Sequence, residues 1–342
     1  MAVQDSVTAE SVAADLRKYT NVIVEGVAGC GKSHLLEGLR EQYGDRVRVV
    51  VFHPATSYED FVSGLRPGKD MGFTGEAGVF VEMCEDAAAD PDHDYLLFID
   101  EINRANTSRV FGDLMLVLEA SKRADLREEA AEDKRAALLT ERTPHTIALQ
   151  TPVEERSEQF RYLQVPRNLH VLGTMNTTDR SVGTIDLALR RRFHWVTMQP
   201  LDEPGLRAEL DAQNGSSEHL HRLITWYAAT NRQLQTQVGP DARLGHSYFF
   251  GEDRSVEDVA TDLLNQLKEV VATFNIHEDK IKKIVGDGAP VGAELWTIVL
   301  QGQGLGRRPE IDRKLKTAAQ PSPQNDGSEA SEDAPTDAQS EG

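Results

Sequence analysis

The chain has 342 residues and a formal net charge of −19 at pH 7. Hydrophobic residues make up 39% of it, and no apolar run approaches the ~20 residues that a membrane span needs. The negative charge argues against a surface that coats nucleic acid broadly, although a local basic patch remains compatible with it. Two cysteines are too few for a disulfide framework, and the polar, acidic N-terminus is not a signal peptide. We therefore expect a cytoplasmic protein without membrane contact.

A glycine-rich loop lies between an expected strand at 22–24 and an expected helix that begins at His34. Its sequence is Gly26-Val27-Ala28-Gly29-Cys30-Gly31-Lys32-Ser33. Glycines let successive backbone N–H groups point at phosphate oxygens, and the N-terminus of the following helix adds positive potential. In such loops the lysine, here Lys32, reaches the β- and γ-phosphates, and the hydroxyl, here of Ser33, ligates Mg²⁺. The sequence therefore predicts a site for a nucleoside triphosphate.

The next hundred residues alternate between expected strands and helices. Apolar and β-branched runs predict the strands, and apolar periodicity with a capping residue predicts the helices. Strands are expected at 47–52 and 95–99, and helices after Ser57, at 79–89 and at 110–118. The glycine-containing stretch 64–78 is expected to be a loop.

Two carboxylates, Asp100 and Glu101, follow the expected buried strand at 95–99. Ligands collect at the carboxyl ends of strands in open α/β sheets, so both side chains are expected beside the phosphate loop. Asp100 would hold the Mg²⁺ shell, and Glu101 would activate the attacking water. An acidic turn after a strand is common by itself, but the upstream loop favours the catalytic interpretation.

The middle of the chain combines a charged segment with further strands. Residues 119–142 are highly charged and Ala-rich, which predicts an exposed helical insertion. Runs at 146–150 and 162–165 flank a polar stretch and predict a β-hairpin. Further strands are expected at 169–174 and 194–198. Asn176, just past the first of these, is placed to hydrogen-bond the γ-phosphate or the water, unless it is only a turn residue.

Three consecutive arginines, Arg190, Arg191 and Arg192, precede the strand at 194–198. A solvated basic turn or a nucleic-acid patch is one interpretation. The favoured interpretation is a guanidinium supplied to the nucleotide of a neighbouring subunit, which raises rates by ~10³–10⁵ where such groups have been measured. The sequence does not distinguish among the three residues.

After Pro200 the pattern becomes helical, and near the end it loses apolar residues. Helices are expected at 206–210, 219–234, 255–274 and 279–284. The final segment is rich in Ala, Pro, Ser, Gly and acidic residues and is expected to be disordered. The expected domains are an α/β nucleotide-binding domain at 1–200, a helical lid at 201–305 and an acidic tail at 306–342.

Several of these segments together resemble the McrB-like branch of AAA+ ATPases. These are the motor subunits of methylcytosine-dependent restriction systems and are related to the MoxR branch. The resemblance covers about residues 8–300 and is carried by Phe52-His53-Pro54, Ser57-Tyr58-Glu59-Asp60-Phe61, Ile99-Asp100-Glu101-Ile102-Asn103-Arg104-Ala105-Asn106, Gly173-Thr174-Met175-Asn176-Thr177-Thr178-Asp179-Arg180-Ser181, Ala188-Leu189-Arg190-Arg191-Arg192-Phe193 and Gly245-His246-Ser247-Tyr248-Phe249. The Met-Asn-x-x-Asp-Arg element at 175–180 is specific to this branch.

The resemblance implies an α/β fold of the AAA+ P-loop NTPase type, with a parallel sheet between helices, a small helical lid and a disordered tail. It implies an ATP-hydrolysing homo-hexamer with Mg²⁺-nucleotide between subunits. It also implies a McrC-like or other nuclease partner, with DNA reached through that partner or the ring pore. Asp179 and Arg180 would lie near the subunit interface. His34, Asp100 and His246 would join the loop around the nucleotide.

The phosphate loop departs from the family pattern, Gly-Pro-Pro-Gly-Thr-Gly-Lys-Thr, at Val27-Ala28, Cys30 and Ser33. Ser33 keeps the metal-ligating hydroxyl. Cys30 places a thiol beside a helix N-terminus, so we expect a lowered pKa and alkylation that bound nucleotide blocks. The sequence begins almost directly at the motor, so recognition of methylated DNA is not among the expectations.

Three functions are compatible with these residues. The first is a ring-shaped motor that drives an effector nuclease in restriction or defence, the second a MoxR-like remodelling or assembly chaperone, and the third a nucleotide-dependent switch. Glu101, Asn176 and the arginines weigh against the switch, and the Met-Asn-x-x-Asp-Arg element favours the motor. No Asn-Lys-x-Asp guanine clamp is visible, so ATP is the expected substrate, with GTP as the alternative.

Overall fold

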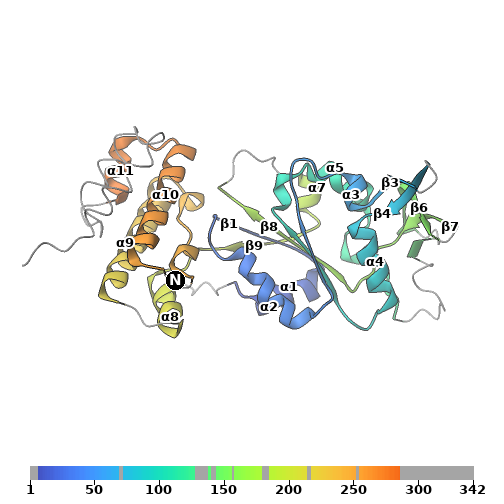
Figure 1. The fold of residues 1–342 in the computed structure, drawn as a ribbon, viewed down its shortest axis with the longest axis horizontal. Coiled ribbons are helices and arrows are strands. Elements are labelled where there is room, and N and C mark those ends of the chain that lie inside the picture. Colours follow the sequence, from blue (N-terminus) through green and yellow to red (C-terminus); the bar gives the residue numbers. More distant parts are fainter. Residues whose placement is uncertain are drawn as a thin grey trace, which may run out of the picture. The chain divides into compact units, whose positions relative to one another are not determined.

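The computed structural model describes residues 7–68, 72–127, 138–139, 144–155, 158–178, 185–213, 217–251 and 254–285, all within a compact unit at 1–290. A parallel sheet with the strand order β2-β5-β8-β1-β9 lies at its centre (Figure 1). Its strands are β1 (Asn21–Gly26), β2 (Val47–Val51), β5 (Tyr95–Asp100), β8 (Leu169–Asn176) and β9 (His194–Met198). The α/β fold with a parallel sheet is thus confirmed.

Alternate side chains of the inner strands pack on opposite faces of this sheet, as the period of a β-strand requires. Val22 and Val24 pack against α1 (Ala9–Tyr19) and α2 (Leu35–Tyr43). Ile23 between them belongs to the other apolar cluster, with α4 (Val79–Ala89) and α5 (Thr107–Phe111). Figure 1 shows helices on both faces of the sheet. Burial on both faces explains why β5 and β8 are continuous apolar runs.

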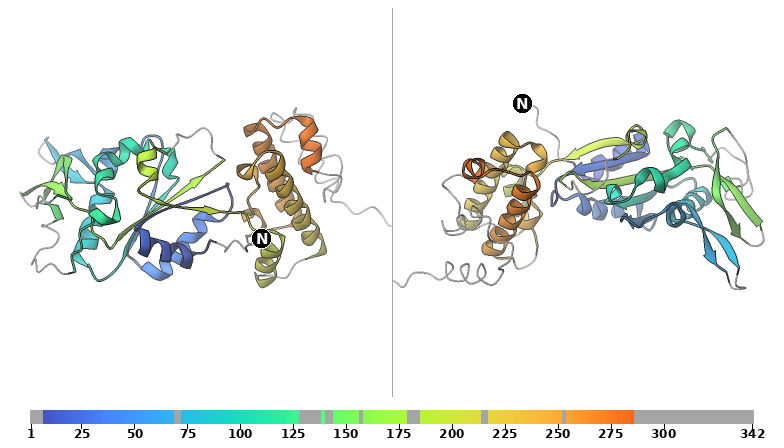
Figure 2. Two further views of the ribbon diagram at one scale, coloured as in Figure 1. Left: turned by 180° about the vertical axis from the view of Figure 1, so that it is seen from behind. Right: turned by 90° about the horizontal axis from the view of Figure 1, so that it is seen from above.

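Two β-hairpins pack against each other outside the central sheet (Figure 2). They are β3 (Ser63–Pro67) with β4 (Phe73–Ala77), and β6 (Ile147–Glu155) with β7 (Glu158–Leu163). The second hairpin confirms the prediction for 146–165. The first hairpin shows that the prediction of a loop at 64–78 is wrong. A Cβ on Gly75 in β4 would lie 1.9 Å from the carbonyl oxygen of Pro152 in β6. The close packing of the two hairpin backbones therefore accounts for a glycine within a strand.

The predicted helix at 110–118 is only partly correct. Helix α5 ends at Phe111, because Gly112 takes a left-handed φ of 48°, and the chain continues as a 3₁₀ turn, η3 (Gly112–Leu116). The helix predicted after Ser57 is present as α3 (Tyr58–Phe61), and Ser57 caps it by accepting a hydrogen bond from the backbone N–H of Asp60.

After β9, the regular secondary structure of the described residues is helical. The α-helices there are α8 (Glu203–Gln213), α9 (Glu218–Gln237), α10 (Val256–Thr273) and α11 (Glu278–Val285). The short helix α7 (Leu187–Arg190) lies before β9. Ser217 and Ser255 cap α9 and α10 through their side-chain oxygens. These helices confirm the predicted positions, with boundaries that differ from the predicted ones by up to three residues. Within the described ranges, no helix combines the length and apolarity needed to cross a membrane.

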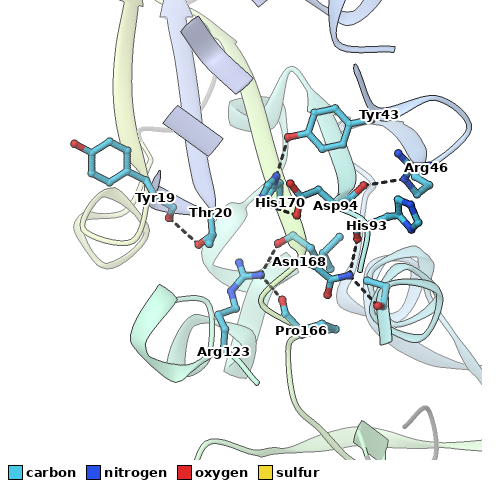
Figure 3. A network of polar contacts seen from close by, with 12 residues as sticks. Tyr19, Thr20, Tyr43, Arg46, His93, Asp94, Arg123, Pro166, Asn168 and His170 are labelled. Carbon is cyan, nitrogen blue, oxygen red and sulfur yellow. Dashed lines mark hydrogen bonds and ion pairs between the residues drawn. The ribbon is translucent and has the colours of Figure 1, made fainter. Parts of the chain in front are cut away.

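A polar network lies at the amino ends of the central strands, opposite the phosphate loop (Figure 3). Arg123 is buried and donates to the carbonyl oxygens of Leu118, Pro166 and Leu169 and to the side-chain oxygen of Asn21. Such a guanidinium replaces solvent for carbonyls that would otherwise lack partners. Arg123 therefore corrects the prediction of an exposed segment at 119–142, most of which lies outside the described residues.

Candidate nucleotide-binding site

The glycine-rich loop begins where β1 ends and leads into a short 3₁₀ turn, η1 (Lys32–His34), and then α2. Gly29 and Gly31 have φ values of 74° and 92°, which only glycine adopts without strain. At Gly26 a Cβ would lie 2.5 Å from the carbonyl oxygen of Met198 in β9. The glycines therefore permit both the curl of the loop and its close fit against the neighbouring strand.

Lys32 is buried under the loop. Its ammonium donates to the carbonyl oxygens of Gly26, at 3.0 Å, and Val27, at 2.8 Å. Burial lowers the pKa of Lys32, and this shift is opposed by the thiol of Cys30 and by the nearby carboxylates of Glu101 and Asp100. The lysine is therefore close enough to interact electrostatically with Asp100, the predicted metal ligand, and with Glu101, the predicted catalytic carboxylate.

Thr174 ties the carboxylate-bearing end of β5 to β8. Its hydroxyl donates to Oδ1 of Asp100 and lies 3.4 Å from the backbone nitrogen of Glu101. The parallel pairing of these strands, with Ile99 opposite Gly173, places Thr174 there. The sequence analysis gave Thr174 no role of its own, although the residue stands between two motif residues in Gly-Thr-Met-Asn.

Glu101 is held by side chains from two elements. The amide nitrogen of Asn176 donates to its Oε1 at 2.6 Å, and Nε of Arg104 lies 3.5 Å from its Oε2. Glu101 has a left-handed φ of 54°, which costs a residue with a Cβ about 1 kcal/mol or more. Backbone strain of this kind concentrates at functional sites, and the side-chain contacts fix the carboxylate where the strand ends.

Ser33 and Asp100 provide the hard oxygen ligands that Mg²⁺ prefers. Ser33 is exposed at the start of η1, and Asp100 ends β5 beside the loop. The donor set therefore fits a magnesium ion held jointly by the protein and by phosphate oxygens. No cluster of three or more His, Cys, Asp or Glu side chains suited to a metal occurs among the described residues.

Residues 245–248, called the lid segment below, contact the phosphate loop. The backbone N–H of Ser247 donates to the carbonyl oxygen of Gly29 at 2.8 Å. His246 is buried, its Nδ1 accepts from the backbone N–H of Leu201 at 3.0 Å, and its Nε2 lies 3.6 Å from the position that a Cβ would take on Gly31. Burial lowers the pKa of His246 to about 4, so the ring is neutral at pH 7.

The three arginines differ in their surroundings. Arg192 is largely buried, and its guanidinium donates to the carbonyl oxygens of Met115 and Ala188. Arg190 lies over the ring of Trp195, 4.6 Å from the ring centroid. Arg191 is exposed, and within the described part of the chain its side chain forms no hydrogen bond or ion pair.

Two further residues that the sequence predicts around the nucleotide, His34 and Cys30, have contrasting surroundings. His34 is exposed, and Nδ1 of its ring lies 3.0 Å from Oε2 of Glu37. Its backbone N–H donates to the carbonyl oxygen of Gly31. Cys30 is fully buried, and burial raises the pKa of its thiol, partly offset by Lys32. The expected lowering of the Cys30 pKa is therefore wrong: desolvation outweighs the cation and the helix end.

Asp179 and Arg180 lie outside the described residues. The structure also places two residues at the site that the sequence analysis did not assign. Arg104 contacts Glu101, and Gln266 of α10 donates to the carbonyl oxygen of Ala28. Gln266 had a detectable signal, because it interrupts an apolar series with helical spacing in α10.

Comparison with known proteins agrees with this geometry. Residues 21–193 match the family model of the AAA domain, dynein-related subfamily. The chain is 33% identical over 277 residues to the type IV methyl-directed restriction enzyme EcoKMcrB subunit of Escherichia coli K12, covering 78% of this chain and 54% of that protein. It is 24% identical over 292 residues to the type II restriction enzyme BsuMI component YdiS of Bacillus subtilis 168, covering 75% and 80%.

The chain thus spans about half the length of the Escherichia coli relative. A solved structure of an ATPase candidate from Cytophaga hutchinsonii covers 92% of this chain and 89% of its own at 14% identity, with a TM-score of 0.35, a likeness too weak to bear on the fold. The family match includes the phosphate loop, both carboxylates, Asn176 and the arginines. The chain belongs to the AAA family, dynein-related subfamily, and within it is a McrB-like AAA+ protein.

Proposed function

We propose that this protein hydrolyses a nucleoside triphosphate, ATP in preference to GTP, with Mg²⁺. The observation that carries the proposal is the hydrogen bond from Asn176 to Glu101, at the strand ends beside the glycine-rich loop. A carboxylate oriented in this way activates or orients a water, whereas a binding module needs no such group. The first coordination shell of Mg²⁺ would include Ser33, with Asp100 close by. The metal would neutralise charge on the phosphates.

In this proposal each residue at the loop has a separate task. Lys32 neutralises the phosphates, exchanging its contacts with the loop carbonyls for contacts with phosphate oxygens. Glu101 orients the attacking water, and Asn176 fixes Glu101 and senses the γ-phosphate. The neutral ring of His246 contributes an N–H group near Gly31, on the lid side of the loop.

The proposal includes a ring, with a homo-hexamer as the expected form, in which one subunit completes the site of the next. Arg191 is the best candidate for the guanidinium supplied in trans, because it is exposed while Arg192 is occupied by carbonyls of its own subunit. Asp179 and Arg180 would lie near the same interface. Residues 1–200 would form the nucleotide-binding domain, 201–305 the lid and 306–342 a disordered tail.

The motor is proposed to drive a McrC-like or other nuclease partner in a restriction or defence system, with DNA reached through that partner or the pore. Two relatives bear the names of restriction-enzyme components, which favours this role over MoxR-like protein remodelling. Co-purification of the full chain from its native host tests the effector. Recovery of a nuclease subunit is the expected result, and recovery of a metal-binding adhesion-type protein would favour the chaperone role.

Steady-state hydrolysis measured over a range of protein concentrations tests the core of the proposal. The rate per subunit is expected to rise with concentration, because assembly completes each site, and to be higher with ATP than with GTP. A rate per subunit that stays constant across the assembly range would contradict the shared site. Faster turnover of GTP would reverse the nucleotide preference.

A further inference from the structure

Two carbonyl oxygens of the phosphate loop accept hydrogen bonds from residues more than two hundred positions later in the chain. Nε2 of Gln266 donates to the carbonyl oxygen of Ala28 at 2.9 Å. The backbone N–H of Ser247 donates to the carbonyl oxygen of Gly29 at 2.8 Å. Consecutive peptide units of the loop are therefore anchored on the same side, by α10 and by the lid segment.

Gln266 uses both ends of its amide. The side chain is 6% exposed, and while Nε2 binds the loop, its Oε1 accepts from the backbone N–H of Gly245 at 3.0 Å. Gly245 approaches the loop so closely that a Cβ would lie 2.2 Å from the oxygen of Ala28. A buried amide with both halves satisfied has one orientation, so Gln266 sets the spacing between the lid segment and the loop.

The geometry of the peptide bond carries this anchoring to the phosphate side of the loop. In a trans peptide the carbonyl oxygen of one residue and the N–H of the next point in opposite directions. Holding the oxygen of Ala28 on the lid side therefore turns the N–H of Gly29 away from the lid. Holding the oxygen of Gly29 does the same for the N–H of Cys30.

Within the described part of the chain, neither N–H group donates a hydrogen bond to another residue. Successive free N–H groups in a curled loop form the concavity that binds phosphate. Rotation of either peptide plane would turn one of these donors away. Gly29 has no Cβ to restrict its φ and ψ and adopts a positive φ of 74°, so the loop does not fix the planes by itself.

We propose that Gln266 is a positioning residue that locks the 28–29 peptide plane of the loop for phosphate binding and thereby couples lid position to triphosphate affinity. The inference rests on the proposed nucleotide site and extends it to the lid. Coupling is reciprocal: a triphosphate that binds the aligned loop also stabilises the docked lid segment. Gln266 touches the loop and not the reacting atoms, so its loss changes affinity more than the rate at saturation.

Asn231 provides a matched control. It is a buried amide of α9 that holds the chain next to the lid segment, donating to the carbonyl oxygen of Leu244 at 3.0 Å and accepting from the N–H of Leu244 at 2.7 Å. Among the described residues, it forms no hydrogen bond with the phosphate loop. Asn231→Leu and Gln266→Met each remove a two-ended amide of similar size from the helical part, but only the second releases the loop.

The test measures equilibrium affinity for Mg-ATP and Mg-ADP, together with KM and kcat, for the full chain and both variants. Gln266→Met is expected to weaken binding of both nucleotides about tenfold and to raise KM, with kcat changed less than about threefold. Asn231→Leu is expected to lower the unfolding temperature while leaving affinity within about threefold. Gln266→Asn keeps an amide but shortens its reach by one methylene, and it should weaken binding in the same way; it also serves if Gln266→Met does not fold.

Unchanged nucleotide affinity in the folded Gln266 variants would overturn the proposal. A loss of affinity in Asn231→Leu as large as that in Gln266→Met would also overturn it, because it would show that any loosening of the lid has the same effect. Both outcomes differ from the result expected if the proposed function is wrong. If it is wrong, the wild-type protein itself binds neither nucleotide.

Discussion

Asn176 at the end of β8 donates its side-chain amide to Oε1 of Glu101 at the end of β5, over 2.6 Å. The two residues are 75 positions apart, and the parallel pairing of β5 with β8 brings them together. Asn176 also lies opposite Gly26, the first residue of the phosphate loop, across the β1–β8 pair. One strand end therefore connects the phosphate loop with the carboxylate that would orient water.

Replacing Glu101 with glutamine is expected to preserve nucleotide binding and to reduce turnover by ~10²–10⁴, because a neutral amide cannot accept the proton of the water. Isothermal titration and single-turnover hydrolysis measure the two effects separately. Near-normal hydrolysis by Glu101→Gln would remove this residue from the mechanism. Asn176→Ala should show a smaller loss of the same kind, since the carboxylate remains but loses its orienting contact.

Arg191→Ala is expected to lose hydrolysis activity, whereas Arg192→Ala is expected to lose folding stability. Arg191 is exposed, so its loss should leave the unfolding temperature unchanged while hydrolysis by the assembled protein falls by ~10³ or more. Arg192 donates to two carbonyls of its own subunit, so its loss should destabilise the fold by about 2 kcal/mol. Calorimetry and hydrolysis assays on both variants give the comparison.

A mixing experiment separates a trans role of Arg191 from a role within its own subunit. Lys32→Ala subunits have an impaired phosphate site but an intact Arg191, and Arg191→Ala subunits have the reverse. Mixed assemblies should recover part of the activity that each variant lacks alone. Failure to recover activity, with mixed assembly demonstrated, would count against Arg191 as the shared group.

Cys30 should react slowly with iodoacetamide at pH 7, because it is fully buried and burial raises the pKa of its thiol. The labelling rate should continue to increase at pH values above the ordinary pKa of a cysteine thiol, because the pKa of Cys30 is raised. The rate should also rise sharply in denaturant, which exposes the thiol. Mass spectrometry of timed samples gives the rate at Cys30, with Cys84, also fully buried, as the internal reference. Fast labelling of Cys30 in the native protein at neutral pH would contradict this burial.

His246 should make the protein less stable as the pH falls. Its pKa of about 4 lies below the ordinary value near 6.5, so between these values the unfolded chain binds a proton that the folded chain does not. Stability is therefore retained above about pH 6.5 and declines toward pH 4, by about 1.4 kcal/mol per pH unit from this residue once the unfolded form is protonated.

His246→Asn provides the comparison, because the asparagine oxygen can replace Nδ1 as acceptor for the N–H of Leu201 and does not titrate. Urea unfolding between pH 7 and pH 4.5 should show a shallower decline for the variant than for the wild type. Parallel curves for the two proteins would show that His246 does not contribute to the pH dependence.

The sequence predicted the inner strands and the phosphate loop well because their signals are local. Residues 95–99 and 169–174 are apolar runs of strand length, and the loop combines glycines with Lys32 and Ser33. The helix at 79–89 was likewise predicted from its periodicity, and its boundaries agree with α4. In each of these cases, short-range pattern and long-range packing favour the same structure.

The incorrect or missing predictions depend on contacts that local pattern does not report. The β3–β4 hairpin is short and contains glycine and proline, and it packs against the strand that contains Pro152. Arg123 resembles a surface charge in the sequence, but the fold places it among the carbonyl oxygens of Leu118, Pro166 and Leu169, and the last two lie more than 40 positions away. The bond from Gln266 to Ala28 spans 238 positions. Cys30 was misjudged because its burial outweighs the electrostatic effects that the sequence suggested.

The most direct test of the account is equilibrium binding of Mg-ATP and Mg-GTP to the folded full chain, with Lys32→Ala measured in parallel by isothermal titration. Saturable binding by the wild type, weakened at least about tenfold in Lys32→Ala, is the predicted result. Folded wild-type protein with no affinity for either triphosphate in the presence of magnesium would contradict the account.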